Sequence, residues 1–161
     1  MFKMFKKKES DYNVYSPVDG EAMLLEEVND QVFSTKMMGE GVGFKLKSGE
    51  VCSPCDGKIT LIAPTKHAFG IEADNGMEIL VHIGLDTVEL GGKGFEVLQQ
   101  PGTRVTKGTA IIRVDLAFME ANNVDLITPM IVTNAIPFAL EDNVIGNEVS
   151  KGETLIIHKE K

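Results

Sequence analysis

The sequence predicts an all-β protein: an antiparallel β-sandwich or flattened barrel with internal pseudo-symmetry and at most one or two short helices. Three observations support this fold class: strand-like runs are short and frequent, glycine-rich turns separate them, and two pairs of segments repeat. The 161 residues are enough for a substantial core. We expect a flexible basic tail over residues 1–11 and a single domain over residues 12–161.

Two internal repeats organise the body of the chain. YSPVDGEAMLL (15–25) recurs as CSPCDGKITLI (52–62), and GTRVTKGTAII (102–112) recurs as GNEVSKGETLI (146–156). Pro, Asp and Gly favour turns in these copies, and the residues after each turn alternate or run apolar, as strands do. The repetition predicts approximate symmetry between strand–turn units.

The strand candidates share short apolar or alternating patterns bounded by turn residues. They span residues 22–25, 32–37, 42–47, 58–63, 67–73, 77–83, 110–114, 127–133 and 154–158. Helical patterns are scarce. DLAFMEANN (115–123) predicts one short helix, with Asp115 as its N-cap and Asn122 or Asn123 near its end.

The charge of the chain is distributed unevenly. The net charge is −8, yet four lysines lie within the first eight residues, which leaves 12 basic against 24 acidic side chains in the rest. Such an acidic body repels a phosphate backbone, so nucleic acid is not an expected partner, whereas basic proteins are. The four lysines of the N-terminus are Lys3, Lys6, Lys7 and Lys8.

The location predicted for the chain is the cytoplasm. No apolar run approaches the roughly 18 residues of a membrane-spanning helix, and the N-terminus lacks the apolar region of a signal peptide. Residues 1–8, MFKMFKKK, interleave Met and Phe with lysines, which is compatible either with a solvated tail or with weak contact to an anionic membrane surface.

The stretch HAFGIEADNGMEILVH (67–82) contains two of the three histidines and reads as a β-hairpin. A two-residue loop, either Asn75-Gly76 or Asp74-Asn75, would bring His67 and His82 together on one face. An odd-length loop without a bulge would separate them. In this interpretation Phe69, Ile71 and Leu80 share the histidine face, which forms an apolar interaction patch.

A pair of imidazoles on one face can perform phosphoryl transfer. Neutral imidazole is a nucleophile at pH 7, and its neighbour can donate an N–H to the phosphoryl oxygens. Thr65 is placed to hydrogen-bond the other nitrogen of His67 and fix its tautomer. Asp86 follows where the strand ends and is interpreted as a rim residue for a basic partner or as a turn residue. The alternative for His67 is a packed core histidine, and His158 is interpreted as a surface residue.

Several motifs resemble one known family. T-x-H-A-F-x-I-E (65–72), G-x-E-x-x-V-H-x-G-x-D-T-V-E-L (76–90) and G-x-G-F (92–95) are similar to the glucose-type IIA component of the bacterial phosphoenolpyruvate-dependent sugar phosphotransferase system. The likeness also covers SPVDGE (16–21) and VFSTKMMGEGVGFK (32–45). The family fold, an antiparallel β-sandwich, agrees with the fold class predicted from the strand pattern.

The resemblance implies a mechanism and a set of site residues. His82 aligns with the phosphorylated histidine, His67 with the assisting histidine and Thr65 with the threonine that orients it. The implied donor is the phosphohistidine of the carrier HPr, and the acceptor is a cysteine of the IIB domain of a sugar permease. The family's apolar and acidic surface residues align with Phe33, Met37, Leu80 and Asp86, while Ala63 and Leu80 replace larger aromatics of several members.

The resemblance also implies no resident cofactor, although some relatives bind zinc transiently at the histidine pair in a partner complex. It further implies a monomer, because a shuttle must leave its site open, and regulatory partners such as permeases, glycerol kinase or adenylate cyclase in some members.

Other interpretations use different residues. Cys52 and Cys55 form a C-x-x-C that, with His67 and His82, would make a Cys₂His₂ zinc site of an interaction module, although the histidine spacing does not fit a zinc finger. A redox C-x-x-C lacks a βαβ context. A biotinyl- or lipoyl-type carrier lacks the expected lysine turn, and a purely regulatory protein would not need Thr65 with both histidines.

Overall fold

The computed structural model describes residues 13–159. The predicted fold class is confirmed: all eleven strand pairings are antiparallel, and helix is limited to two short α-helices and two 3-10 turns within these residues. The helical elements are η2 (Leu25–Glu27), α1 (Gln31–Ser34), η3 (Thr87–Leu90) and α2 (Leu116–Ala121). No helix in this part of the chain is long and apolar enough to cross a bilayer. The basic tail predicted over residues 1–11 lies outside the described residues.

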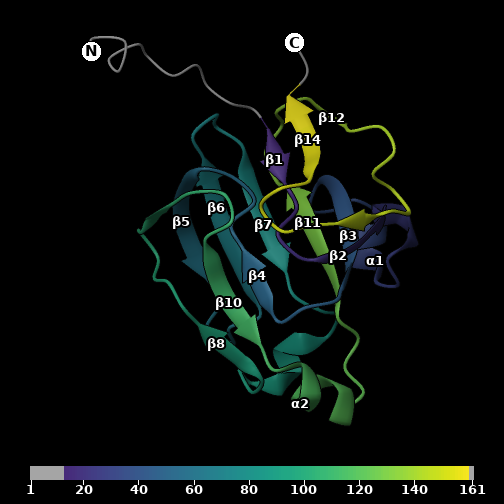
Figure 1. Ribbon diagram of the computed structural model, residues 1–161, viewed down its shortest axis with the longest axis vertical. Helices are drawn as coiled ribbons and strands as arrows, with labels where there is room; N and C mark the ends of the chain where they lie inside the picture. Colours follow the sequence, from purple (N-terminus) through teal and green to yellow (C-terminus); the bar gives the residue numbers. More distant parts are fainter. Residues whose placement is uncertain (1–12, 160–161) are drawn as a thin grey trace.

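The largest sheet has eight strands in the order β13-β2-β3-β11-β7-β6-β5-β9 (Figure 1). Its strands are β13 (Glu148–Val149), β2 (Gly20–Leu24), β3 (Glu40–Leu46), β11 (Ile127–Val132), β7 (Glu78–His82), β6 (Ala68–Ala73), β5 (Gly57–Ile62) and β9 (Arg104–Val105). Because β6 and β7 lie inside this sheet, with β5 and β11 as neighbours, the hairpin that carries His82 is held on both sides.

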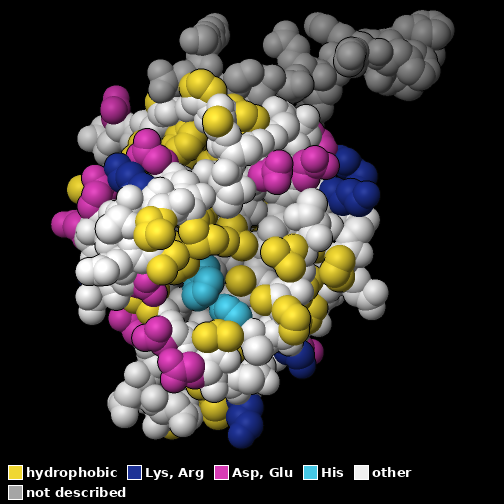
Figure 2. All heavy atoms as spheres, turned by 180° about the vertical axis from the view of Figure 1, so that it is seen from behind, with side chains coloured by type: hydrophobic (Ala, Val, Ile, Leu, Met, Phe, Trp, Pro, Cys, Tyr) yellow, Lys and Arg dark blue, Asp and Glu magenta, His cyan; other side chains and the backbone are white. Residues whose placement is uncertain are grey.

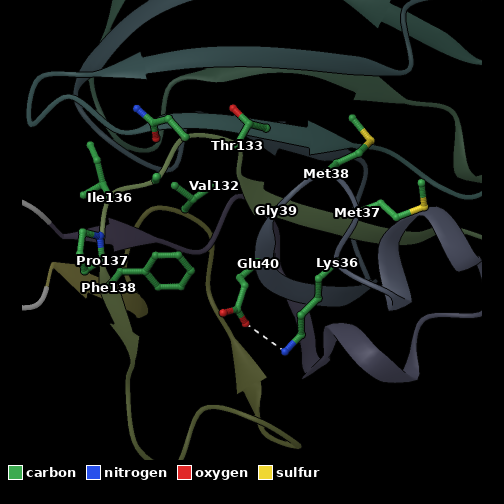
Figure 3. A pocket seen from close by; sticks show the side chains of 12 residues that line it. Lys36, Met37, Met38, Gly39, Glu40, Val132, Thr133, Ile136, Pro137 and Phe138 are labelled. Carbon is green, nitrogen blue, oxygen red and sulfur yellow. Dashed lines mark ion pairs between the residues drawn. The ribbon is translucent and has the colours of Figure 1, made fainter.

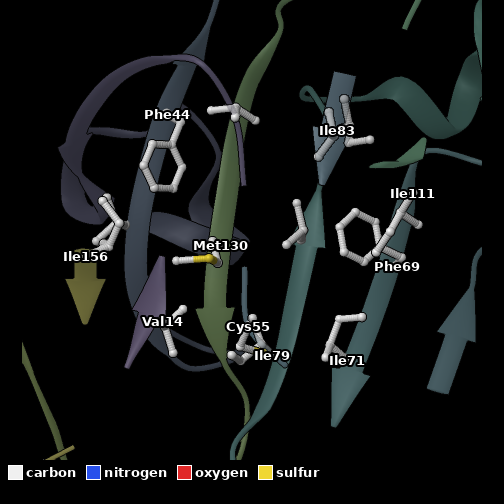
Figure 4. Close-up of a cluster of buried hydrophobic side chains, with 14 of the residues drawn as sticks. Val14, Phe44, Cys55, Phe69, Ile71, Ile79, Ile83, Ile111, Met130 and Ile156 are labelled. Atoms are coloured by element: carbon white, nitrogen blue, oxygen red, sulfur yellow. The ribbon is translucent and has the colours of Figure 1, made fainter. Parts of the chain in front are cut away.

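Two smaller sheets complete the sandwich. They have the orders β1-β14-β12 and β4-β10-β8. Their strands are β1 (Val14–Tyr15), β14 (Leu155–Lys159), β12 (Phe138–Leu140), β4 (Glu50–Cys52), β10 (Ala110–Val114) and β8 (Phe95–Val97). The main core combines buried side chains from all three sheets, among them Phe69, Met130, Ile111 and Ile156 (Figure 4).

The two sequence repeats occupy equivalent positions, as predicted. Gly20 of the first S-P-x-D-G copy pairs with Val149, and Gly57 of the second copy pairs with Val105. The Asp that precedes each glycine accepts a hydrogen bond from the backbone N–H of the lysine in one K-G turn. These bonds join Lys151 to Asp19 at 2.9 Å and Lys107 to Asp56 at 3.0 Å.

The two S-P-x-D-G copies also bind each other reciprocally. The Tyr15 N–H donates to the Pro54 carbonyl at 2.7 Å, and the Cys52 N–H donates to the Pro17 carbonyl at 2.8 Å. Both turns therefore build the fold, which accounts for the C-x-x-C in the second copy as part of a structural turn.

One predicted helix is confirmed and one predicted strand is wrong. Asp115 caps α2 by accepting from the Phe118 N–H at 3.0 Å, as the sequence predicts. Residues 32–37, predicted as a strand, instead contain α1 and the turn after it. The Asp30 carboxylate caps this helix through the Val32 N–H at 2.9 Å, a local signal that outweighs the apolar run.

Residues 25–39 cross the outer face of the large sheet and build a second, smaller hydrophobic cluster there. Its buried members come from η2 and the residue after it, α1, the end of the hairpin and β11; they are Leu25, Val28, Phe33, Leu85 and Ile131. Glycine at position 43 of β3 lets this segment pack closely on the sheet, because a Cβ there would lie only 2.8 Å from Cγ2 of Val28. The cover brings Phe33 to the face that carries His82.

Candidate functional site

The β6–β7 hairpin has a three-residue loop, not either of the predicted two-residue loops. Ala68 pairs with His82, and the Ala73 N–H donates to the Met77 carbonyl at 2.8 Å, so residues 74–76 form the loop. The backbone of the glycine at its end has φ +94°, typical of a three-residue loop that closes with a left-handed residue.

This register changes which side chains face the site. Phe69 and Ile71 pair with Val81 and Ile79, and all four are buried in the main core. The expectation that Phe69 and Ile71 line a partner-binding patch is therefore wrong, because neither has surface to offer a partner. The apolar pattern contained a signal that was missed, because neither predicted two-residue loop places all four of these residues on one face.

Leu80 and His82 lie on the outer face, opposite the core. Leu80 is half-buried against the outer cluster, and His82 is also half-buried. The structure thus retains Leu80 among the predicted surface residues. On the paired strand the residues opposite His82 and Leu80 are the small residues Ala68 and Gly70.

His67 contacts His82 even though the odd-length loop would separate them by strand alternation. Their ring centroids lie 4.8 Å apart at an interplanar angle of 75°. His67 precedes the first residue of β6 and follows a tight turn in which the Lys66 N–H donates to the Ala63 carbonyl at 2.8 Å. Lys66 has φ +65°, so the alternation ends there and His67 is directed to the His82 face.

The hydrogen bond of His82 fixes its tautomer. Nδ1 lies 2.8 Å from the carbonyl oxygen of Gly84, which can only accept, so Nδ1 carries the proton and Nε2 keeps its lone pair. Gly84 has φ +76°, and a Cβ there would lie 2.6 Å from Cγ2 of Thr87. The Phe33 ring packs on the same imidazole, with centroids 5.1 Å apart.

Burial lowers the pKa of both histidines below the usual 6.5. For His82, the hydrogen bond to Gly84 raises the pKa in part, His67 lowers it, and the carboxylates of Asp30 and Asp86 raise it. The pKa of His67 is raised in part by a hydrogen bond to the Thr65 backbone. The neutral form, which is the nucleophilic form of imidazole, is therefore favoured at pH 7.

Thr65 lies where the sequence predicts it. Its Oγ1 is 2.7 Å from Nδ1 of His67, which leaves Nε2 of His67 as the nitrogen available to a ligand. Thr65, His67 and His82 thus form one connected set with both Nδ1 atoms engaged.

The surface around the histidines is apolar with acidic residues further out. Figure 2 shows an adjoining pair of histidine side chains that reach the surface and are bordered by hydrophobic side chains. His67 is the more buried of the pair by exposed area, at 7%, and His82 is half-buried. Met37 is 77% exposed, and Asp86 is also exposed. The predicted surface residue Phe33 is instead mostly buried beneath this face.

Comparisons with known proteins identify the family. Residues 12–137 match the family model described as phosphoenolpyruvate-dependent sugar phosphotransferase system, EIIA 1. The chain belongs to this EIIA family. The PTS system glucose-specific EIIA component of Staphylococcus aureus is 45% identical over 157 residues, covering 98% of this chain and 95% of the relative. That of Staphylococcus epidermidis is 47% identical over 164 residues, covering 96% and 97%.

A solved structure agrees with this assignment. The glucose permease IIA from Mycoplasma capricolum superposes with a TM-score of 0.84 at 39% identity, covering 92% of this EIIA chain and 96% of the other. This EIIA chain and the Mycoplasma protein therefore share the β-sandwich fold. The family match assigns the chain to a sugar transport system.

The Cys₂His₂ alternative is wrong for this EIIA chain. Cys52 and Cys55 are buried, and no group of three or more His, Cys, Asp or Glu within residues 13–159 is placed to hold a metal ion. The histidine pair supplies two nitrogens, whereas zinc usually takes four ligands, so transient zinc would need ligands from a partner. That expectation stays a prediction.

Two features of the EIIA site were missed from sequence. The carbonyl of Gly84 sets the His82 tautomer, and the signal for it was the glycine two residues after His82. Asp30 acts on His82 electrostatically, and it was missed because residues 32–37 were interpreted as a strand rather than as a capped helix.

Proposed function

We propose that this EIIA chain is a phosphocarrier in which Nε2 of His82 accepts a phosphoryl group from phospho-HPr and passes it to a cysteine of the IIB domain of a sugar permease. One observation carries the proposal. The bond from Nδ1 of His82 to the Gly84 carbonyl leaves Nε2 as an unprotonated nucleophile beside a second imidazole, at the centre of an open apolar surface.

In the first step, the lone pair on Nε2 of His82 attacks the phosphorus atom of the donor phosphohistidine. A new N–P bond forms as the donor N–P bond breaks, and the bonding pair returns to the donor imidazole. No proton has to be removed from His82, because burial has lowered its pKa and Nδ1 already carries the only ring proton. The Gly84 carbonyl then stabilises the charge that the ring gains.

His67 holds the phosphoryl group in line. In this proposal the Thr65 hydroxyl, 2.7 Å from Nδ1 of His67, acts as the donor, so the proton of the neutral His67 ring lies on Nε2 and is donated to a phosphoryl oxygen. Because the two rings meet at 75°, the edge of the His67 imidazole is directed toward the phosphoryl group bound to His82. His67 is thus a donor to the transferred group, and Thr65 is a positioning residue.

In the second step, the thiolate of the IIB cysteine attacks the same phosphorus atom. An S–P bond forms, the N–P bond breaks, and the electron pair returns to Nε2 of His82. Both steps exchange one phosphoryl bond for another of similar energy, so the site needs access for two partners more than a large driving force. We place this exchange in the cytoplasm, and the names of the Staphylococcus relatives favour a glucose permease as acceptor.

The test is a reconstituted transfer with labelled phosphoenolpyruvate, enzyme I and HPr. Wild type should acquire acid-labile label, and His82→Ala should acquire none, because the nucleophile is gone. His67→Gln should be labelled from phospho-HPr but should pass the label to IIB more slowly, because the donor to the phosphoryl oxygens is altered.

His158→Gln is the matched control, because it removes the third histidine, which lies on β14 in a different sheet. It should be labelled like wild type. Label on His82→Ala, or its absence from wild type, would overturn the proposal. Acid-stable label would show that the acceptor is not a histidine.

A further inference from the structure

Met37 and Met38 occupy the tip of a tight turn next to the histidine site. The Gly39 N–H donates to the Lys36 carbonyl at 3.2 Å, which closes a four-residue turn with the two methionines at its centre. Lys36 has φ +62°, so the turn departs sharply from the end of α1. Both side chains are presented outward: Met37 is 77% exposed and Met38 is 42% exposed.

The turn is attached to the site by direct contacts. The Lys36 N–H donates to the carbonyl of Phe33, whose ring packs on His82. The Lys36 ammonium lies 3.0 Å from Glu40 and 3.6 Å from Glu26, which anchors the base of the turn. A change at the methionines therefore occurs on the surface that a partner must approach to reach His82.

The thioethers in this turn differ from the core methionines in exposure. Met77, Met119 and Met130 are fully buried. Met37 and Met38, in contrast, line one side of an open groove of about 560 Å³ (Figure 3). A dissolved oxidant therefore reaches these two sulfur atoms directly and is kept from the core sulfurs by packing.

We propose that Met37 and Met38 are an oxidation site through which peroxides reversibly weaken partner docking. The sulfur lone pair attacks one oxygen of hydrogen peroxide, an S–O bond forms, the O–O bond breaks, and the released hydroxide takes the proton of the sulfur-bound hydroxyl to give water. The sulfur is oxidised by two electrons to a sulfoxide, and the peroxide is reduced. Two thiols of a reductase system reverse the change, giving the thioether, a disulfide and water.

The thiols of the chain do not compete for the oxidant. Cys52 and Cys55 are buried, and burial raises the pKa of Cys52 to about 12. Because the thiolate is the form that attacks peroxide, this thiol is nearly unreactive at neutral pH. Within the described residues, Met23 is half-buried, so the sulfur atoms most open to oxidation are those of Met37 and Met38.

The sulfoxide places a strong dipole on a surface that a partner must desolvate. Burying that dipole unpaired should lower the rate of transfer from limiting phospho-HPr by about tenfold, through a higher KM with kcat little changed. This inference rests on the proposed phosphocarrier function. Labelling by phosphoramidate, a small donor that needs no apolar docking surface, should be unaffected.

The experiment treats the full chain with limiting hydrogen peroxide, maps oxidised methionines by mass spectrometry, and measures labelling from phospho-HPr and from phosphoramidate. The double variant Met37→Leu, Met38→Leu is treated in parallel and keeps every other methionine. Each rate is divided by that of the same protein before oxidation. Methionine sulfoxide reductases with dithiothreitol then test reversal.

The expected result is oxidation at Met37 and Met38 with the core methionines unmodified. HPr-dependent labelling of wild type should fall and recover after reduction, and the double variant should keep its own starting rate. Equal losses in wild type and double variant, equal losses with both donors, or no loss despite complete oxidation would each overturn the inference. Untreated protein that phosphoramidate labels but phospho-HPr does not would instead remove the proposed function.

Discussion

His67 and His82 meet edge to face, with ring centroids 4.8 Å apart, although strand register alone would direct them to opposite faces of their hairpin. The contact depends on the turn before β6, where Lys66 adopts φ +65° and interrupts strand alternation. The site is therefore held by backbone geometry at two places, this turn and the left-handed residues Gly84 and Asp86 after β7.

Replacing Thr65 by valine should show whether Thr65 acts by orienting His67 or only by packing. Valine keeps the shape but loses the hydroxyl that lies 2.7 Å from Nδ1 of His67, so the tautomer of His67 is no longer fixed. We expect onward transfer to IIB to slow by about tenfold or more, as for loss of one positioned hydrogen bond in a reaction site. Rapid-quench kinetics measure the rate. Thr65→Ser retains a hydroxyl and should stay near wild type; serine and valine variants with equal rates would contradict the role.

Gly84→Ala tests the backbone that holds His82. The added Cβ would lie 2.6 Å from Cγ2 of Thr87 and 2.8 Å from the Asp125 carbonyl oxygen, and φ is +76°. We expect the free energy of unfolding in urea to fall by about 2–4 kcal/mol, combining strain with overpacking. Gly91→Ala is the matched control, because φ is +62° there and nothing lies within 4 Å of the new Cβ. It should lose only about 1 kcal/mol; equal losses would show that packing at Gly84 is unimportant.

The rate of His82 phosphorylation should depend on pH with a midpoint below 6.5. Burial lowers the pKa of His82, so the imidazole stays neutral and nucleophilic above that value and is protonated only in more acidic solution. Initial rates from phospho-HPr should therefore be flat from pH 6.5 upward and fall below it. Phosphoramidate labelling over the same range controls for titration of HPr. A His82 midpoint above 6.5, measured by NMR, would contradict this prediction.

The same shift affects stability. The unfolded state binds more protons than the folded state between the lowered pKa and 6.5, so the free energy of unfolding contributed by neutral His82 is present above pH 6.5 and lost as the pH falls through the folded pKa. His82→Gln should show a shallower loss of stability over this window in urea titrations. If the free energy of unfolding fell equally with pH in wild type and variant, the His82 pKa would not be linked to stability.

Phe33→Ala should destabilise the hydrophobic cluster on the outer face of the large sheet and expose His82 to water. Phe33 is nearly fully buried, and its ring packs on His82 with centroids 5.1 Å apart. We expect a loss of about 3 kcal/mol in unfolding free energy and a rise of the His82 pKa toward 6.5 in an NMR titration. Phe95→Ala, on β8 of another sheet, should destabilise without moving that pKa. A His82 pKa that responds equally to both variants would exclude a local effect of Phe33.

The sequence by itself determined the strand-rich fold and its internal symmetry, whereas Thr65, His67 and His82 were named together through the family resemblance and a two-residue loop that the structure does not have. Local chemistry explains this success. The S-P-x-D-G and K-G turns need particular residues wherever they occur, so two copies of each predict two equivalent units. The carboxylate of Asp115 likewise specifies its helix cap without help from the rest of the chain.

Only the tertiary structure decided the hairpin register and the cover over its outer face. The segment Asp74-Asn75-Gly76 is compatible with a two- or a three-residue loop, and the choice follows from burying Phe69 and Ile71 together with the partners they meet in β7. Packing of residues 25–39 on the sheet then sets Phe33 against His82. Both outcomes depend on contacts between distant segments, because turn and strand preferences are local whereas burial is a property of the whole fold.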